Sequence, residues 1–315
     1  PDLPLNVSRS ALQNDGFVQK ISEYIAKKVA DKLTGMCKTD REAYEKYWDD
    51  ISPFIKFGCI KDSKFADKLH DYILFKDLDN KYLTLKDCIE ANKKEEAEHT
   101  EEETQENAEE NKDEKEPEKT TVFYVTDPVQ QSQYINMFKE AGKNAVILSH
   151  NIDTAFISHL EQRDQTLQFK RIDADLTEEL KGGDAADDDT AKTLTELFRK
   201  NLNKEKLEVK VESLKNEAVS AMMMLSEESR RMQDMMKMYN MYGMDPGMFG
   251  GQETLVLNIN HPLVKFLAEN QESEHAAVIC EQLYDLAMIS HKQLSPDEMT
   301  KFVQRSNDIL MLLTK

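Results

Sequence analysis

The spacing of apolar residues divides the chain into stretches of different secondary structure. From Phe17 to Leu33 apolar residues recur at every third or fourth position, the period of an amphipathic helix, and Gly35 is expected to end it. The same period predicts a second helix from Asp40 to about Ile51, ended by Pro53, and a third over residues 64–74. The first stretch is therefore predicted to be helical. Three aromatic side chains are available for its core: Trp48, Phe54 and Phe57.

Beyond residue 119 the period shortens and strands alternate with helices. Residues 121–125, 145–148 and 168–172 are short apolar runs typical of strands. Helical patterns over 130–141 and 154–162 separate them. This order predicts a compact parallel α/β unit with right-handed crossovers over residues 120–175.

The last part of the chain, residues 187–315, mixes both periods. We expect a helix over 190–202, strands near 208–212, 217–222 and 254–259, and three closing helices. Ser295, Pro296 and Glu298 give the last helix a capping-box start. The predicted fold is thus mixed α+β and α/β: a helical segment, a small three-layer α/β unit, and an α+β C-terminal domain.

Residues 90–119 differ from both neighbours in composition. They hold 14 acidic residues against 5 lysines, a net charge of −9, within a chain whose net charge is −19. No aliphatic side chain larger than alanine occurs there, so we predict a disordered insertion. It is either a solvated linker or an acidic docking tail. A surface this acidic repels nucleic acids and anionic membranes, which makes both poor partners.

The remaining composition gives little sign of independent catalysis. The four cysteines are far apart and form no CxxC pair, and neither a signal peptide nor a long apolar run is visible, which predicts a cytoplasmic protein. No nucleotide-binding glycine loop, HExxH motif or calcium loop occurs, and we expect no metal site. One enzyme hypothesis stays open, a cleft near Thr126 and Ser149 of the α/β unit. The side chains available to it are few: Asp127, His150 and Asp153.

The first informative motif is a polar loop just before the first helix. Residues 2–9 read DLPLNVSR, and Leu12 and Gln13 follow. An arginine on such a loop can reach a phosphate during phosphoryl transfer, although a surface arginine paired with a carboxylate has the same appearance. The segment resembles the middle-domain loop of the ninety-kilodalton heat-shock chaperones. The resemblance implies that Arg9 and Gln13 contact the γ-phosphate of ATP held by an N-terminal domain, and that Asn6 braces the loop.

The second motif is a methionine-rich segment. Ten of the 15 methionines lie between Ser220 and Met248. Met232, Met235, Met236 and Tyr239 share one helical face, which suits contacts with many unlike apolar surfaces. Spacing alone favours a core or a subunit interface for these methionines. Charged residues before the segment and glycines after it favour an exposed helix. In the heat-shock family the corresponding helix contacts clients, which implies five client-binding residues: Met232, Met235, Met236, Tyr239 and Met241.

The third motif, Asn258–Val264, reads NINHPLV and is similar to a signature of the same family. We expect Asn260 to cap the helix that begins near Pro262, and His261 to form a structural hydrogen bond. Two apolar helices follow, with more apolar surface than one small domain covers, so a two-fold four-helix bundle is predicted. The expected interface residues are Leu283, Leu286, Ile289, Phe302, Ile309, Leu310 and Leu313.

The resemblance to the bacterial HtpG type of this family extends over nearly all of the chain. It implies that residues 1–89 are the end of the middle domain's large part with a helical connector. Residues 120–175 would be its small subdomain and 187–315 the dimerisation domain. The whole protein would be a stress-response ATPase with ATP and magnesium that remodels partly folded clients. This chain, lacking the ATP-binding domain, is expected neither to hydrolyse ATP nor to hold a cofactor. The alternative is a dimeric scaffold that binds no clients.

Overall fold

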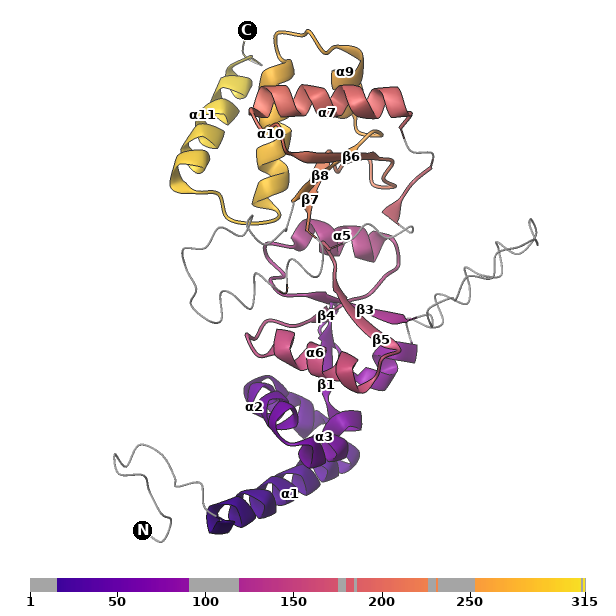
Figure 1. Ribbon diagram of the computed structural model, residues 1–315, viewed down its shortest axis with the longest axis vertical. Coiled ribbons are helices and arrows are strands. Elements are labelled where there is room, and N and C mark those ends of the chain that lie inside the picture. The colour runs from indigo at the N-terminus through magenta and orange to yellow at the C-terminus, as the bar shows by residue number, and fades with distance from the viewer. Residues whose placement is uncertain are drawn as a thin grey trace, which may run out of the picture. The chain divides into compact units, whose positions relative to one another are not determined.

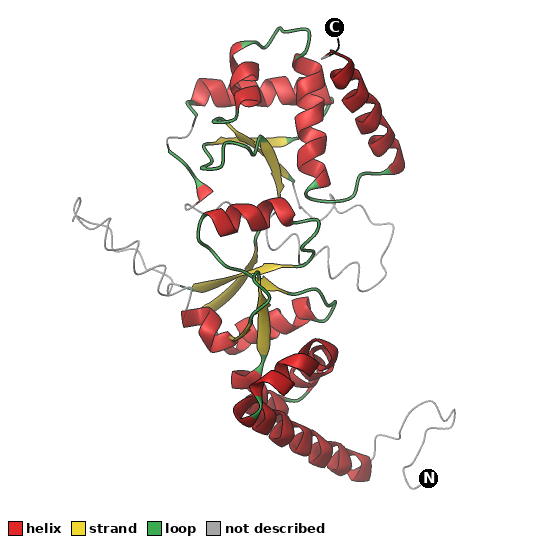
Figure 2. Ribbon diagram, turned by 180° about the vertical axis from the view of Figure 1, so that it is seen from behind, coloured by secondary structure: helices red, strands yellow, loops and turns green. Residues whose placement is uncertain are grey.

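The computed structural model describes residues 16–90, 119–174, 180–183, 186–225, 231, 253–312 and 314. The chain forms two compact units (Figures 1 and 2). The first comprises residues up to Val122 together with His150–Phe169. The second comprises Phe123–Ser149 together with the chain from Lys170 onward. Asn6, Arg9, Gln13, the five proposed client-binding residues, Leu313 and the acidic insertion from residue 91 to 118 lie outside the described residues.

Three helices open the first unit: α1 (Gly16–Thr39), α2 (Arg41–Lys61) and α3 (Ser63–Leu69). The ends predicted at Gly35 and Pro53 are wrong, because both residues lie inside helices. A proline removes one backbone donor, yet α2 continues past Pro53 because buried side chains lie on either side of it. Trp48 belongs to this buried face, as predicted, but Phe54 and Phe57 are 77% and 52% exposed.

A β-hairpin follows where a third helix was expected to continue. A short 3-10 turn (His70–Tyr72) ends the helical region, and β1 (Leu74–Asp77) pairs antiparallel with β2 (Tyr82–Thr84). At the turn, the Asp77 carboxylate accepts the backbone N–H groups of Asp79 and Lys81, and Asn80 has a positive φ of 63°. Strands of four and three residues are too short for their period to appear in the sequence.

The predicted strands and helices of the α/β region are confirmed. They are β3 (Thr120–Val125), α5 (Ser132–Glu140), β4 (Val146–Ile147), α6 (Asp153–Arg163) and β5 (Leu167–Arg171). The three strands are neighbours in the order β4-β3-β5, and β3 pairs parallel with β4. The division between the two units falls within β3 and β5. Helix α5 therefore belongs to the second unit and α6 to the first.

A three-stranded sheet forms the centre of the second unit. Its strands are β6 (Glu208–Glu212), β7 (Ala221–Met224) and β8 (Thr254–Asn258), in the order β6-β8-β7. Strand β8 pairs parallel with β6 and antiparallel with β7. The predicted strand near 217–222 is confirmed in type but begins only at Ala221. Helices α7 (Asp188–Leu202), α9 (Pro262–Glu269) and α10 (Ala276–Ile289) gather on one side of this sheet (Figures 1 and 2).

The core of this unit forms where α7, α9 and α10 meet the sheet. Leu255 and Leu257 of β8 point into it together with Met223 of β7. Because side chains alternate along a strand, Val256 and Met222 point to the opposite face, and they are buried as well. Three of the ten clustered methionines, Met222 to Met224, thus lie on β7, an outer strand of this three-stranded sheet. The last helix, α11 (Pro296–Leu312), has no buried side chain.

Candidate functional site

The described residues directly precede or follow the segments that carry the proposed functional side chains. Helix α1 begins at Gly16, directly after residues 1–15, which include Arg9 and Gln13 and lie outside the described residues. Strand β7 begins the methionine-rich segment, and β8 follows it in the sequence. Helices α10 and α11 carry six of the seven expected interface residues. The structure therefore shows how each segment is anchored.

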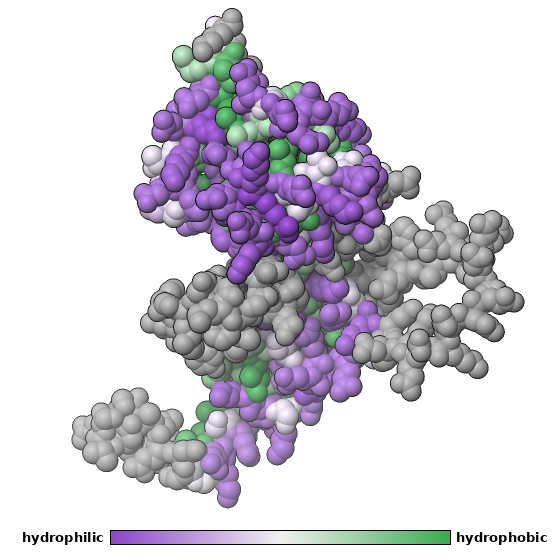
Figure 3. Space-filling view, turned by 45° about the horizontal axis from the view of Figure 1, so that its top comes forward, coloured by the Kyte–Doolittle hydropathy of each residue, from purple (hydrophilic) through white to green (hydrophobic). Residues whose placement is uncertain are grey.

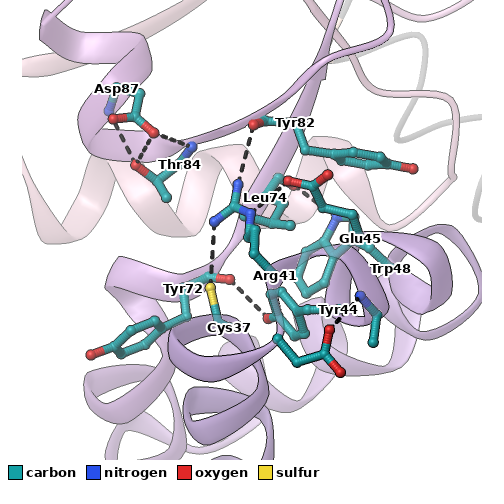
Figure 4. Close-up of polar contacts among 12 residues, drawn as sticks. Cys37, Arg41, Tyr44, Glu45, Trp48, Tyr72, Leu74, Tyr82, Thr84 and Asp87 are labelled. Atoms are coloured by element: carbon teal, nitrogen blue, oxygen red, sulfur yellow. Dashed lines mark hydrogen bonds and ion pairs between the residues drawn. The ribbon is translucent and has the colours of Figure 1, made fainter.

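Arg41 anchors the C-terminal end of α1 (Figure 4). Its guanidinium donates to the Glu45 carboxylate at 2.6 Å, to the Cys37 sulfur at 3.4 Å and to the Tyr82 carbonyl at 3.1 Å. Those partners belong to α2, α1 and β2. Asp40 caps α2 by accepting the Ala43 N–H at 3.2 Å. One planar cation thus holds two helices and the hairpin together.

Two buried aromatic side chains attach α2 to the start of the hairpin. The Trp48 indole N–H donates to the Leu74 carbonyl at 2.9 Å, and the Tyr44 hydroxyl donates to the Tyr72 carbonyl at 2.8 Å (Figure 4). Burial raises the pKa of the Tyr44 hydroxyl well above its usual value, so this hydroxyl stays protonated as a donor. These contacts therefore fix α2 and the C-terminal end of α1 against the hairpin.

The side chains considered for an enzyme cleft have structural partners instead. Asp153 forms a buried ion pair with Lys56, and it also accepts the backbone N–H of His150 at 2.9 Å. Asp127 accepts the N–H groups of Val129 and Gln130, which shapes the turn before α5. Both carboxylates are used by the fold. No group of acidic, histidine or cysteine side chains able to hold a metal is found among the described residues.

The described residues on either side of residues 226–252 lie at one place in the second unit. Met224, the last residue of β7, pairs with Thr254, the first residue of β8. On one side, the buried Tyr134 hydroxyl of α5 donates to the Met223 carbonyl at 2.6 Å. On the other side, Glu253 contacts the side chains of His291 and Lys292, which follow α10. We call this place the neck and define it by Tyr134, Met223, Glu253, His291 and Lys292.

Glu253 carries the strongest electrostatic contacts of the neck. Its carboxylate lies 2.6 Å from the Lys292 ammonium and 3.6 Å from Nε2 of the buried His291. The hydrogen bond with His291, and then that with Lys292, lower the pKa of Glu253 to about 2, against the opposing effect of burial. A second contact joins α5 to the end of α10, since the Ser290 hydroxyl donates to the Gln133 side-chain oxygen at 2.8 Å.

The NINHPLV motif locks the loop between β6 and β7. The Asn258 side chain accepts the N–H groups of Leu214 and Asn260 and donates to the carbonyls of Asn216 and Val219. Asn260 donates to the Ser213 hydroxyl and the Leu214 carbonyl. The prediction that Asn260 caps the next helix is wrong because its side chain is used for this loop.

His261 caps α9 instead. Its Nδ1 accepts the Leu263 N–H at 3.2 Å, and burial lowers the pKa of the imidazole, which favours the neutral form that can accept. The structural role predicted for this histidine is therefore confirmed. The motif fixes the end of β8 and the start of α9 and provides no ligand.

Helix α11 is attached to α10 mainly through one arginine. Arg305 contacts the carboxylates of Glu281, at 3.0 Å, and Asp285, and it donates to the Gln282 side-chain oxygen at 2.9 Å. The capping box predicted at Ser295 is confirmed, because its hydroxyl accepts the Glu298 N–H and its own N–H donates to the Glu298 carboxylate.

The apolar side of these two helices is open in the single chain. Leu310 is 58% and Leu286 44% exposed, and hydrophobic residues are visible among hydrophilic ones on this unit's surface (Figure 3). Ile289, Phe302 and Ile309 are half-buried. Leu283 is only 1% exposed and belongs to the core, so its side chain has no surface left to offer a partner.

Comparison with known proteins supplies the family. The sequence matches the family described as Hsp90 protein over residues 1–100 and 113–315. The chain belongs to the Hsp90 protein family. It is 34% identical over 291 residues to the chaperone protein HtpG of Bacteroides fragilis, covering 89% of this chain and 40% of that protein. The HtpG proteins of Bacteroides thetaiotaomicron and Porphyromonas gingivalis are each 32% identical, covering 87% of this chain and 39% of each relative. The resemblance inferred from the three motifs is thereby confirmed.

Two features set this Hsp90 chain apart in these comparisons: a short unmatched segment and its length. Residues 101–112, inside the acidic insertion, lie outside the family match. The chain spans about 40% of the length of the HtpG relatives it matches. Among the described residues, no helix is long and apolar enough to cross a membrane.

Sequence reasoning missed the neck of this Hsp90 chain. Glu253 and His291 are separated by 38 positions in the sequence, and no sequence motif contains both of them. Tyr134 lies in a different predicted unit from Met223. The only local signal was that Glu253 directly precedes a strand.

Proposed function

We propose that this chain is the client-binding and dimerising part of an ATP-dependent chaperone that works as a clamp-like homodimer. Membership of the Hsp90 family, with relatives named as chaperone proteins, supports this function. The structural observation that carries it is α11, a helix of 17 residues with no buried side chain. Such a helix is stable only when its apolar side is covered, because isolated helices of this length are marginal in water.

A second copy of the chain is the proposed cover. Met299, Val303 and Leu310 are exposed, and their spacing places them on one side of α11. Arg305 holds the other side against α10. Two such pairs of helices can close into a four-helix bundle with an isologous interface, formed by Leu286, Ile289, Phe302, Ile309, Leu310 and Leu313.

The methionine-rich segment is the proposed client-binding element. Met232, Met235, Met236, Tyr239 and Met241 are the contact residues, because flexible, polarisable side chains adapt to many apolar surfaces. In support, the described chain holds both ends of the segment at the neck. Four free cysteines, three of them buried with pKa values raised to about 12, suit a reducing compartment, and we place this activity in the cytoplasm.

ATP and magnesium belong, in this proposal, to the whole protein. Arg9 and Gln13 contact the γ-phosphate of ATP bound by the N-terminal domain, and Asn6 supports their loop. Arg9 and Gln13 lie within the residues that match the Hsp90 family, which supports such a role. The chain alone is expected to show no ATP turnover. Turnover in a pure preparation that is lost in Arg9→Ala would contradict this assignment.

The deciding experiment is the solution mass by light scattering. The full chain should be a dimer, and truncation before Ser295 should give a monomer. Leu310→Glu should also give a monomer, whereas Gln304→Glu, on another side of α11, should leave the dimer intact. A monomeric full chain would refute the homodimer.

The alternative function is a dimeric scaffold without clients. In a scaffold, the methionines would lie in the subunit interface, and Met235→Glu would dissociate the dimer. If the chain is instead a chaperone, the Met235→Glu variant should stay dimeric and should bind reduced, carboxymethylated α-lactalbumin more weakly than wild type. The two functions therefore give opposite results in one variant.

A further inference from the structure

The neck joins four elements that are distant in the sequence. Strand β7 ends there and β8 begins there, with Met224 opposite Thr254. Helix α5 contributes Tyr134, and the connection between α10 and α11 contributes His291 and Lys292. The strand ends that border residues 226–252 therefore lie beside these contacts.

The contacts of the neck also determine where α11 begins. The backbone N–H groups of His291 and Lys292 both donate to the Met288 carbonyl, at 2.9 and 2.8 Å, so these residues continue the end of α10. Their side chains contact the carboxylate of Glu253, which directly precedes β8. The capping box of α11 starts only three residues after Lys292, at Ser295. Glu253 is therefore tied to residues that lie between the end of α10 and the start of α11.

Helix α5 contacts both β7 and the C-terminal end of α10. Tyr134 is buried and holds β7 through the Met223 carbonyl, while the adjacent Gln133 accepts from Ser290 at the C-terminal end of α10. Consecutive residues of one helix thus hold the strand that leads into the methionine-rich segment and the helix end that leads to α11. Few side chains make these contacts, so losing one affects both.

We propose that the neck is a coupling joint, in which Tyr134 and Glu253 tie the chain leading into residues 226–252 to the position of α11. Because α11 is the dimerisation helix and residues 226–252 are the client-binding segment in the proposed function, the inference about regulation rests on that function. Through this joint, binding of a client to residues 226–252 changes the position of α11, and a change in the position of α11 changes how residues 226–252 bind clients. The mechanical coupling between these two parts of the chain rests only on the contacts of the neck and does not depend on the proposed function.

The test perturbs the neck and measures both sides in the full chain. Glu253→Gln removes the charge and keeps the shape, and Tyr134→Phe removes one hydroxyl and keeps the ring. The control is Glu274→Gln, because Glu274 lies 3.5 Å from His275 in an exposed pair of similar length in the same unit. The first readout is the rate of tryptic cleavage at Arg230, Arg231 and Lys237. The second is hydrogen–deuterium exchange of residues 296–312.

The joint predicts that both readouts change together. Glu253→Gln and Tyr134→Phe should each increase cleavage and α11 exchange at least threefold, although neither residue lies on α11, and Glu274→Gln should change neither. The double variant should change less than the two single effects multiplied, because both act on one joint. A change in cleavage without a change in α11 exchange, or no change in either, would overturn the proposal.

If one variant fails to fold, a second variant can still test the coupling. Circular dichroism identifies a variant that has unfolded, and Lys292→Met then replaces Glu253→Gln as the second perturbation of the same contact. Failure of the proposed function is recognised separately. A wild-type chain that is monomeric by light scattering removes the dimer but leaves the joint in place if cleavage and exchange still respond together.

Discussion

Lys56 of α2 and Asp153, the first residue of α6, form an ion pair 2.5 Å long with both side chains 5% exposed or less. The pair spans 97 positions of sequence and joins the helical segment to the α/β unit. Asp153 also accepts the His150 N–H, and the Lys56 ammonium lies 5.8 Å from the centre of the Phe156 ring. Each charge therefore has partners that compensate for its loss of water.

Removing one member of this pair should destabilise the first unit strongly. Asp153→Asn leaves the Lys56 charge buried without its counterion, and we expect a loss of about 3–5 kcal/mol in the free energy of unfolding. Urea denaturation followed by circular dichroism measures this loss. The control is Asp67→Asn, because Asp67 pairs with Arg163 of α6 at the same distance of 2.5 Å but in solvent. It should lose less than about 1 kcal/mol. Equal losses would show that burial is not the cause.

Glu253 should make the second unit sensitive to acid. Its pKa falls from 4.5 to about 2 on folding, so the charged carboxylate stabilises the folded state above about pH 5. This contribution is lost as pH falls from about 4.5 towards 2, because the folded state must then take up a proton it excludes at neutral pH. At about 1.4 kcal/mol per pKa unit the full effect is on the order of 3 kcal/mol.

The variant Glu253→Gln isolates that effect. At pH 7 it should be less stable than wild type by roughly 2–3 kcal/mol, and the difference should shrink as the pH approaches 3. Urea titrations at pH 7, 5, 4 and 3 provide the comparison. A difference that stays constant with pH would mean that the Glu253 charge does not contribute.

The sequence predicted secondary structure best where a segment was long enough to show its period. Helix α7 and strand β8 were placed within two residues, since each carries a clear pattern over its whole length. Hairpin β1–β2 was missed because its strands are short. Pro53 and Gly35 were assigned as helix ends because local propensity favours that assignment, whereas tertiary burial of residues such as Trp48 and Ile55 decided the outcome.

Side-chain partners were the least predictable feature. The capping box at Ser295 involves residues three positions apart, so the sequence shows it directly. Asn260 was given a local cap, but its partners Ser213 and Leu214 are 47 and 46 positions away. Tyr134, which donates to the Met223 carbonyl 89 positions along the chain, could not be recognised for the same reason.

Asn258 should be among the least replaceable polar residues of the second unit. It is fully buried and makes four hydrogen bonds, three with the backbone of the β6–β7 loop and one with the backbone of the turn before α9. Asn258→Ala leaves those backbone groups unpaired in the interior, each costing about 1–3 kcal/mol. We expect a loss of at least about 3 kcal/mol in the free energy of unfolding by urea denaturation. Asn203→Ala, at an αL cap on the surface, should cost less than about 1 kcal/mol.

Arg305 should control the attachment of α11 without affecting the core. Its guanidinium bonds to three side chains of α10, and no side chain of α11 is buried, so this cation provides most of the specific contact between the two helices. Arg305→Lys keeps the charge but lacks the planar fork that reaches Glu281, Gln282 and Asp285 together. Both Arg305→Ala and Arg305→Lys should therefore loosen α11.

The loss should appear in α11 itself. We expect hydrogen exchange of residues 296–312 to quicken by about tenfold or more in Arg305→Ala, which corresponds to about 1.4 kcal/mol of local stability, and by less in Arg305→Lys. Exchange of β6 and β8 should stay unchanged, because these strands belong to a core that Arg305 does not enter. Faster exchange throughout the unit would instead mean that α11 is part of the cooperative core, and the dimer would then depend on folding of the whole unit and not on docking of one helix.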